Sequence, residues 1–296
     1  MRHRGLAVAL GLLGDRLLGE PPDDLHPVAW FGTAMTRLED RIWKDDRRAG
    51  VAYAACGTAI GAVSGSILRS TTAAVGIAAA GRQLRTVATS IGSMLEDDDL
   101  DAARDKLPWL VGRDPSELDA SGVAAAVIES LAENSVDAVV APVFWGLVAG
   151  APGALAHRAI NTMDAMVGHK SDRYRNFGWA AARLDDAANY VPARLFALVV
   201  AIQQPSRAAS IIERIRSDAP AHPSPNAGVA ETAVSAALGI ELGGALRYGE
   251  LVENRPHLGV GPRPSATDIE RAVATVDRAE LLLVVALLAG WATRRR

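Results

Sequence analysis

The chain has 296 residues, a formal net charge of −3 and a single cysteine, Cys56. This length allows one large or two ordinary domains, and the small net charge gives no reason to expect nucleic-acid binding. A lone cysteine excludes an intrachain disulfide. Hydrophobic residues make up 49% of the chain and aromatic residues only 5%. The many alanines and glycines are typical of closely packed helices, in water or in lipid.

The first part of the chain is predicted to be helical. Residues 1–14 begin with the basic "MRHR" and continue apolar, but no A-x-A-like cleavage site follows, so we expect a retained first helix rather than a signal peptide. The prolines of "EPPDDLHP" (20–27) predict a loop. Residues 50–81 are apolar around Arg69, which predicts either one long helix or two short helices that turn at "LRSTT".

The second part is also predicted to be helical, with rigid loops between helices. Asp119 or Ser121, at the end of "GRDPSELD", is a suitable N-cap for the helix that follows. "HPSPNAG" (222–228) and "GGALRYGE" (243–250) are expected to be loops. Period-two alternation is scarce, and there are no repeats or low-complexity linkers, so we predict a single all-α domain over 1–296.

Two uncharged windows, 49–68 and 138–156, approach the length of a membrane span. A spanning helix needs roughly 20 mostly apolar residues. The mean hydropathy is only +0.12, which is low for a protein that lies mostly in a bilayer. Length and composition therefore leave a soluble helical bundle and a polytopic membrane bundle equally open.

Glu129, Glu133 and Asp137 recur every four residues, just before the second uncharged window. On a helix they fall within about 80° of one another, where like charges repel. A divalent cation or opposing arginines would offset that repulsion. A solvated helix face is the alternative, but an unpaired charge entering apolar sequence is costly.

A second polar group lies further along the chain. Asp185 and Asn189 are one turn apart, Asp186 follows Asp185, and Asn161 and Asp164 precede them. Carboxylate and amide oxygens suit Mg²⁺, which takes one or two carboxylates together with substrate phosphates. A surface salt bridge or a helix-dipole interaction is the alternative.

Basic residues separate these two acidic groups. They are Arg158, His169, Lys170, Arg173, Arg175 and Arg183. Such a group predicts a phosphate site with arginine as the bidentate donor, or else cations that flank an apolar span. His26 and His222 each precede a proline, and each is either a general base, a substrate contact or a structural loop histidine. No P-loop, dinucleotide fingerprint, H-E-x-x-H or G-x-S-x-G motif occurs.

Several long segments carry a family resemblance. They are "GDRLLGEPPDDLHPVAWFG", "VGRDPSEL", "ESLAENSVDAVVAPVFWGLVAGAPGALAHRAINTMDAMVG", "RYRNFGWAAARLDDAANYVPARL" and "HPSPNAG". Together, and in this order, they resemble adenosylcobinamide-phosphate synthase, the CobD/CbiB family of cobalamin biosynthesis. The resemblance covers almost the whole chain.

The resemblance implies a multi-pass protein of the cell (inner or plasma) membrane whose active site faces the cytoplasm. It implies an ATP- and Mg²⁺-dependent ligase that joins the propionate carboxyl of adenosylcobyric acid to the amine of (R)-1-aminopropan-2-ol or its O-phosphate. The expected partners are these small molecules and membrane lipid, with no nucleic acid; the oligomeric state is left open. The basic tail "RRR" predicts a cytoplasmic C-terminus.

The resemblance and the residue patterns together define the expected site. The expected catalytic residues are Glu129, Asp137, Asp185 and Asp186. The expected metal ligands are Glu129, Glu133, Asp137, Asp164, Asp185 and Asp186. The expected substrate- and phosphate-binding residues are Asp15, His26, Asn134, Arg158, Asn161, Lys170, Arg173, Arg175, Asn189, His222, Ser224 and Asn226.

Two alternatives and one topological constraint accompany this interpretation. An intramembrane Mg²⁺-dependent transferase should carry two similar aspartate motifs, whereas "ESLAENSVD" and "RLDDAAN" are dissimilar. A non-catalytic sensor or transporter on the same scaffold would not need the acids. Because ATP is cytoplasmic and the window 138–156 separates two motif segments, we expect this window to be broken and re-entrant, or the site to be a polar cavity.

Overall fold

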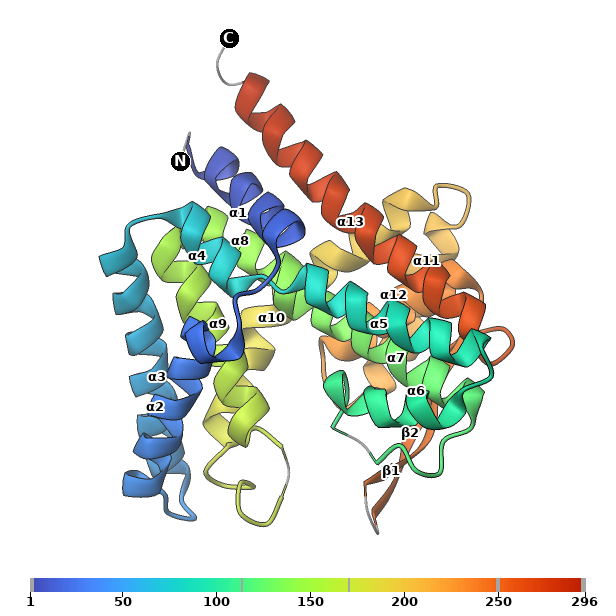
Figure 1. Ribbon diagram of the computed structural model, residues 1–296, viewed down its shortest axis with the longest axis horizontal. Coiled ribbons are helices and arrows are strands. Elements are labelled where there is room, and N and C mark those ends of the chain that lie inside the picture. The colour runs from blue at the N-terminus through green and yellow to red at the C-terminus, as the bar shows by residue number, and fades with distance from the viewer. Residues whose placement is uncertain (1–2, 113, 170, 249–250, 294–296) are drawn as a thin grey trace. The chain divides into compact units, whose positions relative to one another are not determined.

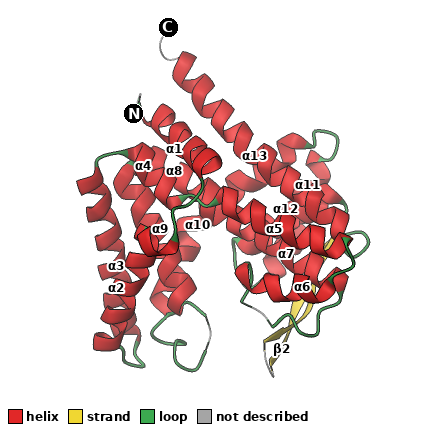
Figure 2. Cartoon of the chain, in the orientation of Figure 1, coloured by secondary structure: helices red, strands yellow, loops and turns green. Residues whose placement is uncertain are grey.

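The computed structural model describes residues 3–112, 114–169, 171–248 and 251–293, and helices dominate this part of the chain (Figure 2). Lys170 and the basic tail, residues 294–296, lie outside the described residues. The chain divides into two compact units, each built from separated segments. Unit 1 comprises Met1–Arg82, Asp137–Pro192 and Leu283–Arg296, and unit 2 comprises Gln83–Val136 and Ala193–Leu282. Neither unit is continuous in sequence, and the single domain stays a prediction.

The elements follow one another along the chain as Figure 1 shows by colour. The first group is α1 (Arg4–Leu18), η1 (Asp23–Leu25), α2 (Pro27–Ile42), α3 (Arg47–Leu68), α4 (Thr71–Ala78), α5 (Gly81–Glu96), α6 (Leu100–Lys106) and η2 (Leu107–Trp109). The second is α7 (Ala120–Ser135), the π-helical turn η3 (Val136–Val140), α8 (Ala141–Ala149), α9 (Ala151–Val167) and α10 (Trp179–Gln203). The third is α11 (Ala208–Asp218), η4 (Ala219–Ala221), α12 (Ala227–Leu238), β1 (Glu241–Tyr248), β2 (Leu251–Gly259) and α13 (Ala266–Thr293).

The prediction of a helical fold is confirmed over most of the described residues, with one exception: residues 241–248 and 251–259 form an antiparallel hairpin of β1 and β2. The expected loop over residues 243–250 belongs in part to β1. Gly243 and Gly244 have φ angles of 83° and 98°, and the register shifts between Leu242 and Gly244. Glycines that signal a loop here serve a β-bulge instead, because a bulge needs the left-handed backbone that glycine adopts readily.

The apolar segment 50–81 forms two helices, which settles the alternatives left open by the sequence. Arg69 ends α3 in the left-handed conformation, with a φ of 56°. The Ser70 side chain then accepts a hydrogen bond from the Ala73 amide and caps α4. At the start of α7, Asp119 is the capping residue, and its Oδ1 accepts from the Gly122 amide at 2.7 Å.

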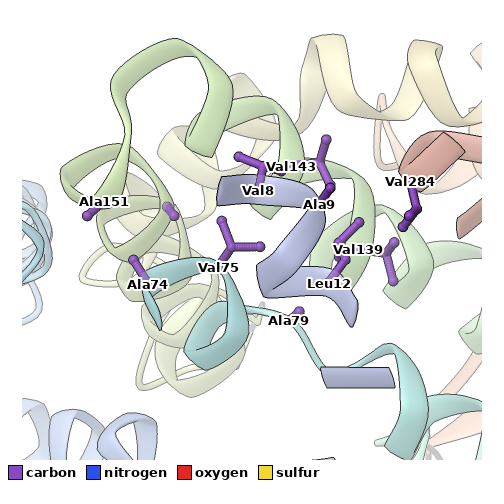
Figure 3. Packing of buried hydrophobic residues seen from close by; sticks show 11 residues of the cluster. Val8, Ala9, Leu12, Ala74, Val75, Ala79, Val139, Val143, Ala151 and Val284 are labelled. Atoms are coloured by element: carbon purple, nitrogen blue, oxygen red, sulfur yellow. The ribbon is translucent and has the colours of Figure 1, made fainter. Parts of the chain in front are cut away.

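The core of unit 1 is made of small and branched apolar side chains from α1, α4, η3, α8, α9 and α13 (Figure 3). Its buried members are Val8, Ala9, Leu12, Ala74, Val75, Ala79, Val139, Val143, Ala151, Ala154 and Val284. A second buried cluster of unit 1 is richer in large side chains and joins α2, α3, α9 and α10. Its members are Met35, Tyr53, Ile160, Met163, Val167, Phe177, Ala181 and Ala188.

Helices α3 and α9 approach each other closely because glycines line one face of α3. A Cβ atom placed on Gly57 would lie 2.3 Å from the sulfur of Met163. One placed on Gly61 would lie 2.6 Å from the carbonyl oxygen of Leu155, and one on Gly65 would lie 2.4 Å from that of Ala151. The four-residue spacing of these glycines therefore brings the backbones of the two helices into contact.

The expected break in window 138–156 is present at Gly150. Helix α8 ends at Ala149, Gly150 takes a φ of 70°, and α9 begins at Ala151. A Cβ on Gly153 would lie 2.5 Å from the carbonyl oxygen of Trp145, so α9 turns sharply back against α8. The π-helical turn η3 precedes α8, which interrupts the regular helix at Asp137 as well.

Two helical segments of the described residues are long and apolar enough to cross a membrane: Arg47–Leu68 and Ala120–Val167. In the first, only 28% of the apolar window is buried, whereas 61% of the second is buried. Helix α3 instead exposes Val51, Ile60, Val63 and Ile67. These lengths and compositions suggest a membrane protein only weakly, since core helices of soluble proteins have similar lengths and compositions.

Replacing Gly61 by alanine should lower the melting temperature. Alanine favours a helix over glycine by about 0.5–1 kcal/mol, but here its Cβ would overlap the Leu155 carbonyl and overpacking costs about 1–3 kcal/mol. Gly14→Ala is the matched control, since no atom lies within 4 Å of a Cβ at Gly14. Thermal melts should show Gly14→Ala unchanged or stabilised and Gly61→Ala destabilised; equal behaviour would contradict the close α3–α9 contact.

Candidate functional site

A polar cluster forms in unit 1 where α9, α10 and the π-helical turn η3 contribute side chains. His157 and Asn161 are one turn apart on α9, and Asp185 and Asn189 are one turn apart on α10. Each pair therefore shares one face of its helix. Asp137 comes from η3. π-Helical turns are found frequently at functional sites, because the extra residue redirects a side chain.

The cluster is connected by side-chain hydrogen bonds. The Asn161 amide donates to Oδ2 of Asp137 at 2.9 Å and to Oδ1 of Asp185 at 3.4 Å. The Asn189 amide donates to Oδ2 of Asp185 at 3.0 Å, and its Oδ1 lies 2.8 Å from Nε2 of His157. Because the Asn189 oxygen can only accept, the His157 proton is on Nε2. One continuous network thus runs from Asp137 to His157.

The two aspartates of this network repel each other and a third. Burial, and then the negative charges of Asp137 and Asp164, raise the pKa of Asp185 well above its ordinary value. The amide hydrogen bonds from Asn189 and Asn161 act in the opposite direction and are too weak to cancel the shift. A positive charge bound between these carboxylates would relieve the repulsion.

Arg158 follows His157 on α9 and is near this cluster. Its charge interacts electrostatically with Glu20 and Asp137. Glu20 in turn lies 3.9 Å from Nε2 of His26. Neither His157 nor Glu20 was predicted to belong to the site. For His157, the spacing of one helical turn from Asn161 was the feature that could have indicated a shared helix face.

The donor set fits Mg²⁺ with phosphate rather than a metal held by protein alone. Among the described residues, no three His, Cys, Asp or Glu side chains are placed to hold a metal ion together. Mg²⁺ needs only one or two carboxylates when substrate phosphates complete its shell. Asp137 and Asp185, with Asp164 nearby, offer hard oxygen donors of that number.

The other acids of the expected metal set have different surroundings. Glu129 belongs to unit 2, where it is 2% exposed and its Oε1 accepts from the Gly243 amide at 2.9 Å. Glu133 is exposed. Asp186 pairs with Arg183 at 3.6 Å. The structure therefore brings Asp137, Asp164 and Asp185 within electrostatic range of one another, and the metal-binding role of all six acids stays a prediction.

The two His-Pro histidines have the same local structure in different units. Nδ1 of His26 accepts from the Val28 amide at 3.1 Å, and Nδ1 of His222 lies at the same distance from the Ser224 amide. Nε2 of His222 lies 3.8 Å from the buried Glu231. Both histidines thus cap the backbone two residues on, which is the structural alternative considered above.

The remaining expected binding residues of unit 2 make local contacts. The Asn134 amide donates to the carbonyl and hydroxyl oxygens of Ser130 at 2.9 and 2.8 Å. Asn226 accepts from Arg194 at 2.9 Å. The Ser224 hydroxyl oxygen accepts from the Ala227 amide, at the first residue of α12, at 3.2 Å. Their roles in substrate binding stay predictions.

In unit 1, Arg173 is engaged in a structural contact. Its guanidinium donates to Oε1 of the buried Glu39 at 3.0 Å and stacks over Trp43, 4.6 Å from the ring centroid. Tyr174 donates to the same Glu39 oxygen at 2.9 Å. These contacts fix the loop after α9 to α2. An arginine so engaged is less available to a phosphate than the sequence suggested.

Two further expected contacts of unit 1 are described. Arg175 pairs with Asp172 at 3.6 Å, and both side chains are exposed. Oδ2 of the buried Asp15 accepts from the Arg82 amide at 3.2 Å, which links α1 to the start of α5. Arg175 is thus accessible to a ligand, whereas Asp15 has a structural contact.

A family profile described as CobD/Cbib protein matches residues 8–276 of the chain. The chain belongs to this family. It is 44% identical to the cobalamin biosynthesis protein CobD of Mycobacterium tuberculosis (strain CDC 1551 / Oshkosh), over 91% of this chain and 90% of that protein. It is 41% identical to the proteins of the same name from Rhodobacter capsulatus, over 96% of both chains, and Chromobacterium violaceum, over 97% and 98%. No solved structure matches the chain significantly.

The region that matches the CobD/Cbib family contains the whole network from Asp137 to Asn189. It also contains the two His-Pro segments and the unit 2 residues around Glu129. The resemblance identified from the motifs is confirmed. The comparisons name a family for these side chains and assign none of them a role.

Asp137→Asn should make thermal stability less sensitive to pH. The pKa of Asp185 is higher in the folded protein than in the unfolded chain. Its contribution to the free energy of unfolding is therefore fully present at a pH below the unfolded-state pKa and is lost as pH rises through the folded-state pKa. Removing the Asp137 charge lowers this pKa, and asparagine keeps an oxygen for Asn161. We expect a smaller fall in melting temperature as pH rises above about 4, the ordinary pKa of an aspartate, measured with EDTA present.

The fully exposed Asp172 provides the control for this measurement. Asp172→Asn removes the same charge outside the network, so its melting curve should follow the wild type at each pH. Curves of wild type and Asp137→Asn that run parallel over the whole range would contradict the electrostatic coupling of Asp137 and Asp185.

Proposed function

We propose that this protein is an ATP- and Mg²⁺-dependent amide ligase of cobalamin biosynthesis. It would join adenosylcobyric acid to (R)-1-aminopropan-2-ol or its O-phosphate and so form adenosylcobinamide or adenosylcobinamide phosphate. Membership of the CobD/Cbib family and the names of its relatives support the pathway. The observation that supports the chemistry is the network of Asp137, Asn161, Asp185 and Asn189.

Amide formation from a free carboxylate is unfavourable in water and needs an activated carboxyl. Transfer of a phosphoryl group from ATP to the carboxylate oxygen, with release of ADP, supplies that activation, and the amine then displaces phosphate and loses a proton. Transfer of a nucleotidyl group would instead release pyrophosphate, and the amine would displace AMP. Mg²⁺ held by Asp137 and Asp185, with Asp164 nearby, would neutralise charge on the phosphates. The network meets this requirement because its donors are hard oxygens whose mutual repulsion a cation would offset.

The amide side chains have a positioning role in this proposal. Asn161 contacts both aspartates and thereby fixes their separation. Asn189 orients Asp185 and is itself oriented by His157 from α9. Preorganised ligands of this kind need no rearrangement when a charged substrate arrives.

A location in the cell membrane, with several spans and a cytoplasmic active site, is part of the proposal. Residues 49–68 of α3 measure about 30 Å as a helix, the thickness of a hydrocarbon core. Arg47, Arg48 and Arg69 stand at the two ends of this stretch, where their charges can reach the lipid headgroups. The exposed valines and isoleucines of α3 support contact with lipid.

Activity is tested with adenosylcobyric acid, ATP, Mg²⁺ and aminopropanol or its phosphate, with the product read by mass. Asp137→Asn and Asp185→Asn should each lower kcat by at least about 100-fold, because each removes a charge that would hold Mg²⁺. Both variants should remain folded, and raised Mg²⁺ should partly restore at least one of them.

The exposed Asp172→Asn variant is again the control and should keep full activity. If neither Mg²⁺ nor EDTA changes the activity or the melting temperature of the wild type, the metal-dependent chemistry is contradicted. If Asp137→Asn and Asp185→Asn are poorly folded and Mg²⁺ does not restore their activity, these acids have a structural role instead. Absence of the amide product in all conditions would contradict the ligase.

The protein should stay with membranes when cells are fractionated. We expect it in the pellet after a high-salt wash and in the supernatant only after detergent, since buried apolar area rather than charge would hold it there. Recovery in the salt wash without detergent would contradict membrane insertion.

A further inference from the structure

A pocket that is open to solvent is present in unit 1 between α2, α3, α4 and α9. Its walls are mostly apolar and include Phe31, Ile60 and Leu155. Two hydroxyl side chains, Ser64 and Thr162, and one charged side chain, Arg158, also line it. An apolar pocket with a few polar groups has the composition of a small-molecule site.

Arg158 is unusual because its guanidinium makes no hydrogen bond or ion pair with any described residue. Its Nε is buried without a partner. Glu20 and Asp137 interact with its charge electrostatically, without a hydrogen bond or ion pair. A buried guanidinium nitrogen without a hydrogen-bond partner is costly, and arginines in apolar surroundings are generally paired. An anion that enters the pocket would supply a hydrogen-bond acceptor for this nitrogen.

The surroundings of Arg158 restrict the charge of that anion. Because Glu20 and Asp137 already act on the guanidinium, a doubly charged phosphate monoester would meet two carboxylates and one arginine. A singly charged group meets less repulsion. The apolar walls formed by Phe31, Ile60 and Leu155 favour an apolar body attached to that group.

The position of the pocket on α3 indicates how such a ligand would reach it. Ile60 is 39% exposed, and it lines both the pocket and the exposed apolar face of α3. Ser64 is five residues from Arg69 at the end of this helix, a rise of about 7.5 Å. The opening is thus near one end of a candidate membrane span, on its apolar side.

We propose that this pocket binds an amphiphilic monoanion, a carboxylate or phosphodiester on an apolar chain. The anionic oxygens pair with the Arg158 guanidinium, and the chain lies against Phe31, Ile60 and Leu155. A free fatty acid and an anionic phospholipid share this chemistry. The proposal concerns a ligand other than the substrates of the ligase reaction, and it does not depend on that reaction.

The test uses the detergent-solubilised full-length protein without ATP or corrinoid. Decanoate is added in one arm; in the other, the protein is reconstituted into phosphatidylcholine discs with or without phosphatidylglycerol. Either ligand should raise the melting temperature of the wild type in proportion to its concentration, since a ligand that binds only the folded state stabilises it. Whichever arm shows the shift identifies the source.

Two variants and one control make the test specific. Arg158→Met should abolish the ligand-induced shift, whatever the melting temperature of the ligand-free variant, because it removes the guanidinium that would pair with the anion. Ile60→Trp should fill the pocket and weaken binding at least tenfold while Arg158 stays in place. Arg37→Met removes an exposed arginine from α2 and should bind like the wild type.

Three results would overturn the proposal. One is a wild-type protein that neither decanoate nor phosphatidylglycerol stabilises. Another is an Arg158→Met protein that retains the ligand-induced shift. The third is stabilisation by aminopropanol phosphate alone, which would assign the pocket to a substrate of the ligase. None depends on measured ligase activity, so failure of the ligase assay is distinguishable from failure of this proposal.

Discussion

The side-chain amide of Asn161 is the contact on which the candidate site depends. It donates to Asp137 of the π-helical turn and to Asp185 of α10, so it joins three segments that are far apart in the chain. Two carboxylates would not approach each other in apolar surroundings without such a donor. The backbone contact of α3 and α9, made possible by Gly57 and Gly61, fixes the helix that carries Asn161. Removal of either support would separate the aspartates.

Local rules of sequence predicted much of the fold. Helical periodicity predicted the helices, Asp119 is the cap that its position suggested, and the glycine-rich window is broken at Gly150. The β-hairpin was missed because Gly243 and Gly244 have the composition of a loop and the geometry of a bulge. The helical prediction did not include this hairpin, because composition alone does not distinguish these two uses of glycine.

The candidate site was predicted as a set of residue types, but not as an arrangement. Asp137, Asp185 and Asn189 were recognised from their spacing, and the family resemblance added weight. His157 was overlooked because a single histidine between apolar residues carries no pattern until Asn189 is placed opposite it. Arg173 was expected to bind phosphate, yet it pairs with Glu39, a residue 134 positions away. Pairings of that range depend on tertiary structure and cannot be read from local spacing.

Unit 1 contains two charged groups in unfavourable surroundings. Burial, and then the neighbouring carboxylates, raise the pKa of Asp185, and the Nε of Arg158 has no hydrogen-bond partner beside an apolar pocket. The two cannot neutralise each other, since Arg158 interacts with Glu20 and Asp137 rather than with Asp185. Each therefore costs folding free energy until a ligand of opposite charge binds. Such groups persist in a protein when binding is worth more than stability, so both positions are candidates for ligand contact.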